Sequence, residues 1–341
     1  MFNLFIDLLN KQYKIIFMKT IKNLSLVFLA FVTLWSCSDD DDATTPTTTQ
    51  ELNIVETAQA TPSLSILVEA VVQAGLVDAL SASGSRTVLA PTNDAFTAFL
   101  QANGFATLAD VPNDVLQEIL LNHVIDDANI MSSDLAGATG YTNTLASGPN
   151  STNLSIFWDG TDGVTFNGAS SVALADISTS NGIVHVVDAV IDLPTIATFA
   201  TTNPALTNLV AALQYADTGM PTVPYIDTVS DATAGPFTVF APTDAAFGNL
   251  LVELEVDALT DIATSTIDAA LTYHIVNANV QSSMLASGPV TTLGGDLTAD
   301  ATLFTLTDVN DRVSNIVTTL VDIQAVNGVV HVIDNVLLPQ L

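Results

Sequence analysis

The chain has 341 residues, 49% of them apolar, and its 36 acidic against six basic side chains give a formal net charge of −30. This length suggests about two domains, and the apolar content excludes a disordered acidic polymer. All four lysines precede residue 37, so the rest of the chain repels nucleic acid and anionic lipid headgroups. Solubility in a salty habitat accounts for the charge equally well.

Residues 1–36 have the pattern of an upstream extension followed by a secretory signal peptide. A basic segment after Met18, which we take as the initiator, leads into the apolar run of residues 24–34. This run is well short of the roughly 20 residues that a membrane-spanning helix needs. Residues 34–37 (Leu-Trp-Ser-Cys) resemble a bacterial lipobox, in which the cysteine is acylated and becomes the first mature residue. We therefore predict lipidation at Cys37.

Residues 37–50 are predicted to be an acidic, Thr-rich tether. The run Asp39–Asp42 resembles the export signal that follows the lipidated cysteine in surface lipoproteins of the Bacteroidetes, and a plain solvated tether is the alternative. The Thr/Pro segment after it lacks the apolar content to pack. These signals predict a cell-surface position on the outer membrane of a Gram-negative bacterium, with membrane contact through the lipid anchor only.

Beyond the tether, two blocks of sequence occur twice. Residues 87–96 (TVLAPTNDAF) recur as residues 238–247 (TVFAPTDAAF). Residues 181–188 (NGIVHVVD) recur as residues 327–334 (NGVVHVID). Blocks that recur in the same order indicate a tandem repeat.

The histidines support the same repeat. The chain has four, and they form two pairs at matching positions: His123 with His274, and His185 with His331. We therefore predict two similar domains, at residues 51–194 and 195–341. Each has the size of an ordinary single domain and is expected to fold alone.

In each domain an amphipathic helix is predicted first. Pro62 and Pro204 can start these helices, and residues 220–235 then form an insertion in the second domain, rich in Pro, Thr and Asp, that we expect to be an exposed loop. The first helix carries apolar residues at i, i+3 and i+4 spacing: Leu64, Leu67, Val68, Val71 and Val72.

The repeated Thr-Val-x-Ala-Pro-Thr block predicts a strand that turns sharply into a helix. Thr92 and Thr243 are the expected N-caps, because their hydroxyls can accept from amides of the first helical turn. With neither a Gly-rich loop nor a lysine, this turn does not fit a phosphate site. A further helix is expected after Pro112, with His123 on its apolar face and His274 in the same place in the repeat.

The latter part of each domain is predicted to be mostly strands. Short alternating runs are separated by Asp-Gly turns, and the closing strands are apolar on both faces, which is typical of buried strands. Helices first and strands afterwards favour the α+β class. The predicted strands of this part include Leu154–Trp158, Val164–Phe166, Leu303–Leu306 and Ile316–Leu320.

Three ordered motifs, each present twice, resemble the signature segments of the fasciclin (FAS1) domain. They are the Thr-Val-Phe-Ala-Pro-Thr-Asp block, the mid-domain pair Tyr273-His274 and the closing Asn-Gly-Val-Val-His-Val-Ile-Asp segment. The resemblance covers residues 51–341. It implies two tandem FAS1-like domains, each a β-sandwich wedge flanked by helices, and a role in extracellular adhesion or binding. The first domain departs from the pattern, because Asn122 precedes its histidine where the family has tyrosine.

A catalytic interpretation of the closing strands fails on geometry. His185 and Asp188 are three residues apart, as are His331 and Asp334, so on a strand they face opposite sides about 10 Å apart. No Gly-x-Ser-x-Gly or His-Glu-x-x-His motif occurs. We therefore expect His123, His185 and His331, with Thr92 and Thr243, to be structural residues. No enzymatic activity and no cofactor are predicted.

A metal site is not predicted either. Each domain has two histidines and no free thiol to complete a soft-ligand set. Residues 159–163 and 308–311 bring acidic oxygens together as calcium ligands would, but neither has the spacing of an EF-hand, so hairpin turns are the preferred interpretation.

The candidate partner-binding residues precede the closing strands. Asp176-Ile177 and Asp322-Ile323 lie at matching positions. The resemblance implies a role for them, since an Asp-Ile pair at this place has been associated with integrin binding in animal fasciclin-domain proteins. That the isoleucines are core residues is the alternative. Tyr273 and His274 are further candidates, on the same resemblance.

The sequence thus predicts a lipid-anchored surface protein that binds an extracellular protein or polysaccharide. A secreted or envelope-associated hydrolase and a purely structural envelope protein are the alternatives. Nucleic acid is not an expected partner.

Overall fold

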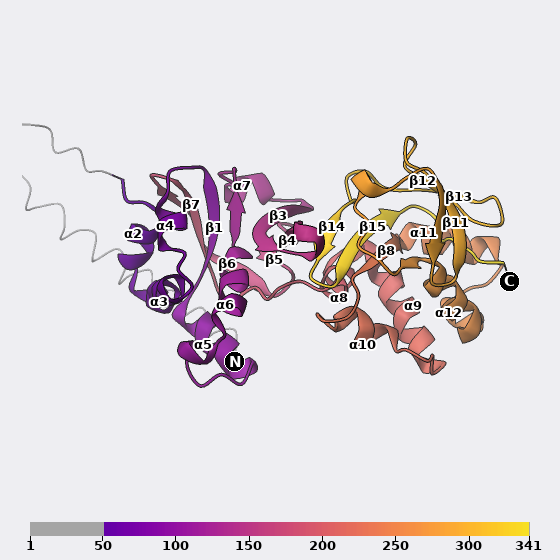
Figure 1. Cartoon of the computed structure of the whole chain (residues 1–341), viewed down its shortest axis with the longest axis horizontal. Coiled ribbons are helices and arrows are strands. Elements are labelled where there is room, and N and C mark those ends of the chain that lie inside the picture. Colours follow the sequence, from indigo (N-terminus) through magenta and orange to yellow (C-terminus); the bar gives the residue numbers. More distant parts are fainter. Residues whose placement is uncertain (1–50, 341) are drawn as a thin grey trace, which may run out of the picture. The chain divides into compact units, whose positions relative to one another are not determined.

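The computed structural model describes residues 51–340, whose elements are drawn in Figure 1. The helices and strands of the first domain are α2 (Ile54–Gln59), α3 (Ser65–Gln73), α4 (Val77–Ser81), β1 (Arg86–Pro91), α5 (Asn93–Ala102), α6 (Asn113–Leu121), β2 (Val124–Asp126), α7 (Ser132–Leu135), β3 (Thr139–Ser147), β4 (Asn153–Asp159), β5 (Thr165–Phe166), β6 (Ser170–Thr179) and β7 (Gly182–Val187).

The second domain follows a similar order of elements. Its elements are α8 (Ile196–Thr202), α9 (Thr207–Thr218), α10 (Tyr225–Ser230), β8 (Phe237–Pro242), α11 (Asp244–Glu253), α12 (Thr264–Tyr273), β9 (Ile275–Val276), β10 (Gly288–Thr292), β11 (Gly295–Asp300), β12 (Thr305–Thr307), β13 (Val313–Asn315), β14 (Ile323–Ala325) and β15 (Gly328–Ile333).

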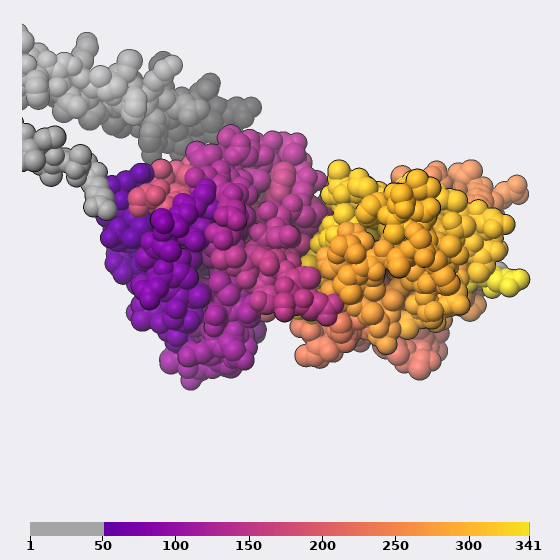
Figure 2. Space-filling view, turned by 45° about the horizontal axis from the view of Figure 1, so that its top comes forward, coloured from indigo at the N-terminus to yellow at the C-terminus, as the bar shows by residue number. Residues whose placement is uncertain are grey.

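Each domain is an α+β unit, as predicted. In the first domain seven strands form one sheet in the order β2-β1-β7-β6-β5-β4-β3, and β6 joins its two halves through irregular pairing with β7. In the second domain the strands form two sheets of four, β14-β15-β8-β9 and β10-β11-β12-β13. The surface of these residues is shown in the same colours in Figure 2.

The closing strands are the buried centre of each domain. Every residue of β7 and of β15 is buried, which confirms the two-faced apolar pattern. Each pairs in parallel with the strand of the Thr-Val-x-Ala-Pro block, so that β7 lies beside β1 and β15 beside β8. Side chains on one face of this pair then pack against the N-terminal helices, while those on the other face the remaining strands.

The turn from β1 into α5 has the predicted cap. The Thr92 hydroxyl accepts from the backbone N–H of Ala95 at 3.2 Å, and Thr243 does the same for Ala246 at 3.2 Å. This bond satisfies one of the amides that a helix start leaves without an intrahelical partner. The prediction of Thr92 and Thr243 as structural N-caps is confirmed.

In the Asn-Gly turn before each closing strand, the asparagine side chain connects helices to the sheet. The amide of Asn327 accepts from the backbone N–H of Ile196 and donates to the carbonyls of Val229 and Asp231, which ties α8 and α10 to the sheet. Asn181 does the same in the first domain, with Ile54, Leu80 and Ala82 as its partners.

The glycine of the turn permits a close backbone approach. Gly328 has φ +152°, and a Cβ at this position would lie 2.1 Å from the carbonyl oxygen of Phe237. The same holds for Gly182, where the Cβ would lie 2.2 Å from the carbonyl oxygen of Arg86. Only glycine therefore allows the parallel ladder to start here.

Several predictions for individual elements were wrong. Residues 225–230 of the presumed exposed loop form α10, because Tyr225 and Val229 are buried in the core. Ile316–Leu320 is not a strand: Ile316 makes one isolated bridge, and the chain then turns. Val72 is 60% exposed, although its spacing placed it on the apolar stripe of the first helix.

Side chains of the first domain also enter the core of the second. Phe157 on β4 is 2% exposed and belongs to the same apolar cluster as Phe199 on α8. The ring of Tyr141 lies edge-on to Phe199, with 5.5 Å between centroids. The backbone N–H of Gln324 on β14 donates to the hydroxyl of Ser155 on β4 at 3.0 Å. A second domain expressed alone would therefore lose two aromatic neighbours, and independent folding stays a prediction.

Gly328→Ala is expected to lower the free energy of unfolding by about 2 kcal/mol or more, because the new methyl group must displace the carbonyl of Phe237 or strain the backbone. Urea denaturation of the parent and the variant measures the change. Gly248→Ala is the matched control: it adds the same methyl group within α11, where no heavy atom lies within 4 Å, and should stabilise by up to about 1 kcal/mol. Equal effects of the two substitutions would contradict the role of the close approach.

Candidate functional site

The histidine of the second closing strand uses both ring nitrogens in structural hydrogen bonds. His331 is 3% exposed. Its Nδ1 accepts from the backbone N–H of Asp322 at 3.2 Å, and its Nε2 lies 2.9 Å from the carbonyl oxygen of Val280. Since a carbonyl only accepts, Nε2 carries the proton and the ring is neutral. Burial lowers the pKa of His331 below its ordinary value of 6.5, which agrees with this assignment.

His185 makes the same pair of bonds in the first domain. Its Nδ1 accepts from the N–H of Asp176 at 3.2 Å, and its Nε2 donates to the carbonyl of Ile130 at 2.8 Å. The ring is 1% exposed. Asp188, which follows on the same strand, instead accepts from the backbone N–H of Ser171. The predicted structural role and the absence of a His-Asp dyad on this strand agree with the geometry.

An aspartate that the sequence did not connect with catalysis lies beside each of these histidines. The Asp322 carboxylate is 3.9 Å from Nδ1 of His331 and accepts from both the backbone N–H and the hydroxyl of Ser282. In the first domain Ser132 makes the equivalent bonds to Asp176.

The Ser-Asp-His order of contacts does not fit nucleophilic catalysis. A reactive serine needs its hydroxyl directed at a base, and the base oriented by a carboxylate. Here the hydroxyl of Ser282 donates to Asp322, and both nitrogens of His331 are already engaged. Asp322 has φ +58°, so its side chain fixes a strained turn in front of β14. No sequence motif singled out these serines, although a Ser-Ser pair occurs at residues 132–133 and again at residues 282–283.

The structure separates the two members of each candidate Asp-Ile pair. Asp176 and Asp322 expose 30% and 33% of their side chains. Ile323 is 2% exposed and packs in the apolar core, and Ile177 is half-buried against the core of the first domain. Ile323 therefore fits the alternative of a core residue, because it faces the core side of β14. Partner binding through the two aspartates stays a prediction.

The mid-domain histidines are buried as well. His274 is 3% exposed, its Nδ1 donates to the carbonyl of Ala270 at 2.7 Å, and its Nε2 accepts from the N–H of Leu337 at 3.0 Å. His123 holds Ile191 in the same way. Each histidine thus joins the end of a helix to the segment after the closing strand. Burial lowers the pKa of both rings to about 4.

Tyr273 and its counterpart Asn122 make different hydrogen bonds in the two domains. Tyr273 is 1% exposed, and its hydroxyl donates to the carbonyl of Asp296 at 2.7 Å. Asn122 donates to the carbonyls of Ile191 and Asp192 instead. Tyr273 and His274 are therefore enclosed by their own domain, and a partner would reach neither without a local opening.

In the two acidic turns that were considered as calcium sites, the carboxylates accept hydrogen bonds from groups of the chain itself. Asp308 is 4% exposed and accepts from the backbone N–H groups of Asn310, Arg312 and Leu338. Asp159 accepts from the backbone and hydroxyl of Thr161. Among residues 51–340, no group of three or more His, Cys, Asp or Glu side chains is arranged to hold a metal ion. Cys37, the predicted lipidation site, lies outside the described residues.

Comparison with known proteins identifies the class. The family model of the fasciclin domain matches residues 62–194 and again residues 204–339. The chain therefore belongs to the fasciclin domain family and carries two copies of the domain in tandem. Both matched ranges lie inside the domain bounds expected from the sequence repeat.

Individual relatives come from cyanobacteria and mycobacteria. Protein sll1483 of Synechocystis sp. is 36% identical over 148 residues, which cover 42% of this chain and 75% of that protein. Immunogenic protein MPB70 of Mycobacterium bovis is 32% identical over 148 residues, covering 42% of this chain and 68% of that protein. Cell surface glycolipoprotein MPB83 of the same species is also 32% identical, and the match covers 42% of this chain and 60% of that protein.

Among solved structures, the chain is similar to a FAS1 domain pair from the insect cell adhesion molecule Fasciclin I. The TM-score is 0.48 at 18% sequence identity, and the match covers 81% of this chain and 97% of that one. Within residues 51–340 of the present chain, no helix is long and apolar enough to cross a membrane.

The buried mid-domain histidines are expected to make the protein less stable in acid. Their folded pKa of about 4 lies below the ordinary value of 6.5, so the unfolded chain binds protons that the folded chain excludes. The free energy of unfolding should therefore fall as the pH drops from 6.5 to 4, by about 3 kcal/mol for each histidine. Urea denaturation at intervals between pH 7.5 and 4.5 measures the slope. A His274→Gln variant, although less stable at pH 7.5, should show a smaller slope than the parent, with the contributions of His123 and His331 left in place. An unchanged slope would contradict the assignment.

Substitution of the second Asp-Ile pair is expected to destabilise the domain. Asp322→Ala leaves the amide and hydroxyl of Ser282 without their acceptor and should cost about 1–3 kcal/mol. Ile323→Ala removes core atoms and should cost about 2–5 kcal/mol. Val252→Ala is the control, since Val252 is 79% exposed and its truncation should change stability by less than about 0.5 kcal/mol. Thermal and urea unfolding measure all three, and parent-like stability of Ile323→Ala would contradict the burial of that side chain.

Proposed function

We propose that this chain is a lipid-anchored cell-surface protein that mediates adhesion to an extracellular protein or polysaccharide. Its lipid would be attached at Cys37, residues 38–50 would form the tether, and the two fasciclin domains would present the binding surface. In a Gram-negative bacterium this places the protein on the outer membrane, facing outward. Membership of the fasciclin family supports the surface role, and the name of the relative MPB83, a cell surface glycolipoprotein, supports the anchor.

The observation that carries this proposal is the use of the signature residues. In both domains the motif histidines and their neighbouring aspartates form hydrogen bonds that hold backbone segments together. The most invariant part of the repeat therefore builds a scaffold, and this favours a binding module over the hydrolase alternative. A scaffold of this kind leaves loops and sheet edges to make contacts with a partner.

The strong negative charge fits the same role. Between residues 51 and 340 the only basic side chains are Arg86 and Arg312, and both form ion pairs with neighbouring carboxylates. Such a surface repels anionic lipid headgroups, so the domains would stand off the membrane that holds the anchor. Neutral glycans and proteins with basic surfaces are the partners that this charge admits.

Cells of a Gram-negative host that express the parent chain are expected to retain it in the detergent phase after phase separation, and to bind to surfaces coated with matrix protein or polysaccharide. Cys37→Ala should leave the protein unprocessed or release it, and cell attachment should fall to that of cells without the protein. Replacement of Asp39–Asp42 by Ala should preserve detergent partitioning but reduce cleavage by external protease. Immunoblots of the phases and counts of attached cells give the three readouts.

Two outcomes would contradict the proposal in different ways. If Cys37→Ala is processed and partitions into detergent like the parent, Cys37 is not the lipid anchor. If the parent chain is anchored but its cells attach to the coated surfaces no better than cells without it, the adhesive function is wrong. That result would favour a structural envelope protein. Turnover of ester or glycoside substrates by purified residues 38–341, lost in His331→Gln although that variant remains folded, would restore the hydrolase alternative.

A further inference from the structure

The second domain contains a cavity that none of the sequence motifs predicted. It has a volume of about 420 Å³, within the range of ligand sites in proteins. It lies among α10, β8, α12 and the segment around β9. Residues that line it are Pro221, Thr222, Val223, Tyr225, Thr228, Val229, Phe237, Val239, Asp268, Thr272, Ile275 and Leu293.

The walls are mostly apolar, and part of this apolar surface is open to water. Val223 is 59% exposed and Leu293 is 53% exposed, although both line the cavity. Val229 and Val239, by contrast, are buried behind them. A bound apolar molecule would cover the exposed side chains at the opening. Removal of this apolar surface from water would favour binding.

One carboxylate interrupts the apolar lining. Asp268 on α12 accepts a hydrogen bond at Oδ1 from the hydroxyl of Tyr225 at 2.7 Å. The hydroxyl of Thr272, one helical turn on, is bonded to backbone carbonyls of α12. Within residues 51–340 the two basic side chains pair elsewhere: Arg86 with Asp126 and Arg312 with Glu253. The Asp268 carboxylate is thus a negative charge at an apolar wall, with no cation of its own domain to balance it.

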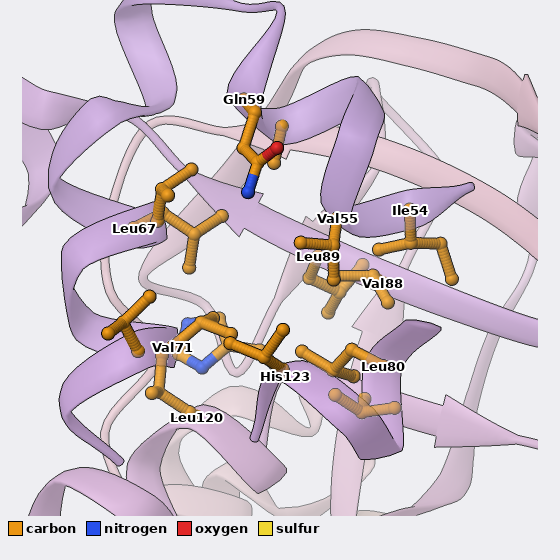
Figure 3. A pocket seen from close by; sticks show the side chains of 15 residues that line it. Ile54, Val55, Gln59, Leu67, Val71, Leu80, Val88, Leu89, Leu120 and His123 are labelled. Atoms are coloured by element: carbon orange, nitrogen blue, oxygen red, sulfur yellow. The ribbon is translucent and has the colours of Figure 1, made fainter. Parts of the chain in front are cut away.

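A cavity of the first domain overlaps this place in part. It is lined by side chains that point toward one another from α2, α3, α4, β1 and the end of α6 (Figure 3). Its free volume is only about 30 Å³, enough for a water or two and too little for an organic ligand. Val88, Leu80 and Val124 line it at positions equivalent to Val239, Val229 and Ile275 of the second domain.

The difference between the domains is a local insertion. The offset between equivalent residues is 142 at Pro62 and Pro204 but 151 at Thr87 and Thr238, so the second domain has nine more residues between these points. These residues belong to the segment before β8 that includes Pro221 and α10. The insertion therefore builds one wall of the cavity, and Asp268 stands opposite it where the first domain has Gln117.

We propose that this cavity binds a small apolar molecule that carries one cationic amine, with the amine against the Asp268 carboxylate and the apolar body between α10 and β8. The charge of the wall selects the amine, because an anion would be repelled by Asp268 and by the acidic surface around it. The site belongs to the second domain only.

The probe for this site is 1-naphthylmethylamine, compared with neutral 1-naphthylmethanol and anionic 1-naphthoic acid. Isothermal titration of the folded chain, residues 38–341, should show one amine bound per chain, at least about tenfold tighter than the acid. Asp268→Asn keeps an acceptor for Tyr225 but removes the charge, and should weaken amine binding by about tenfold or more. Asp227→Asn is the matched control: it removes the same charge from the exposed face of α10 and should leave the affinity within about twofold of the parent.

A cavity-filling variant tests the location. Thr228→Phe directs a ring from α10 into the cavity and should abolish binding of the amine and the alcohol while thermal unfolding still shows a cooperative transition. If this variant does not fold, Asp268→Asn decides the question. Three results would overturn the proposal: no amine binding to the parent, equal amine affinity in Asp268→Asn and the parent, or two equivalents bound per chain. A parent chain that binds no probe and elutes as a dimer would assign the cavity to a second copy instead.

Discussion

Each domain depends on the contact between its Asn-Gly turn and the first residue of the neighbouring parallel strand. At this point the backbone of Gly328 lies so close to that of Phe237 that a side chain has no room. The preceding Asn327 is buried, and its amide satisfies three backbone groups from α8 and from the end of α10. One dipeptide thus aligns the central ladder and fastens the helical layer to it. Nearly everything else in the domain is placed relative to this ladder.

The histidines extend the same principle to other parts of the chain. A neutral imidazole can donate at one nitrogen and accept at the other, so it can join two backbone segments that have no ladder between them. His331 links the turn before β14 to the loop after β9, and His274 links the end of α12 to the C-terminal segment. Burial of a polar group is tolerated in both cases because every polar ring atom has a partner. The motif that first suggests a catalytic group is in fact a device for satisfying buried backbone.

The sequence predicted these features where a residue pattern has one physical solution. A strand that is apolar on both faces must be buried, and this prediction was confirmed. A threonine directly before a helix start, such as Thr92, can cap the helix, and this prediction was confirmed as well. It failed where the outcome depends on contacts between distant segments. Nothing in the Pro-rich residues 220–235 showed that Tyr225 would find a core to enter, so α10 was taken for a loop. The half-open cavity beside it was missed for the same reason, since Asp268 looks like any exposed acid on a helix. The sequence left Ile323 open between a partner contact and a core residue, because the buried side of a three-residue strand cannot be read from so short a pattern.

For the anchor that we propose at Cys37, the direction of the central ladder has a mechanical consequence. In a parallel pair, the start of β1 and the finish of β7 lie at opposite ends of the same ladder, with Arg86 beside Gly182 and Pro91 beside Val187. Tension between the two ends of the domain therefore pulls these strands past each other lengthwise. All the rungs then carry the load together, whereas an antiparallel hairpin pulled at its open end gives way one rung at a time. Since β8 and β15 repeat the arrangement, both domains would resist stretching by flow or by a departing surface after their outer helices had peeled away.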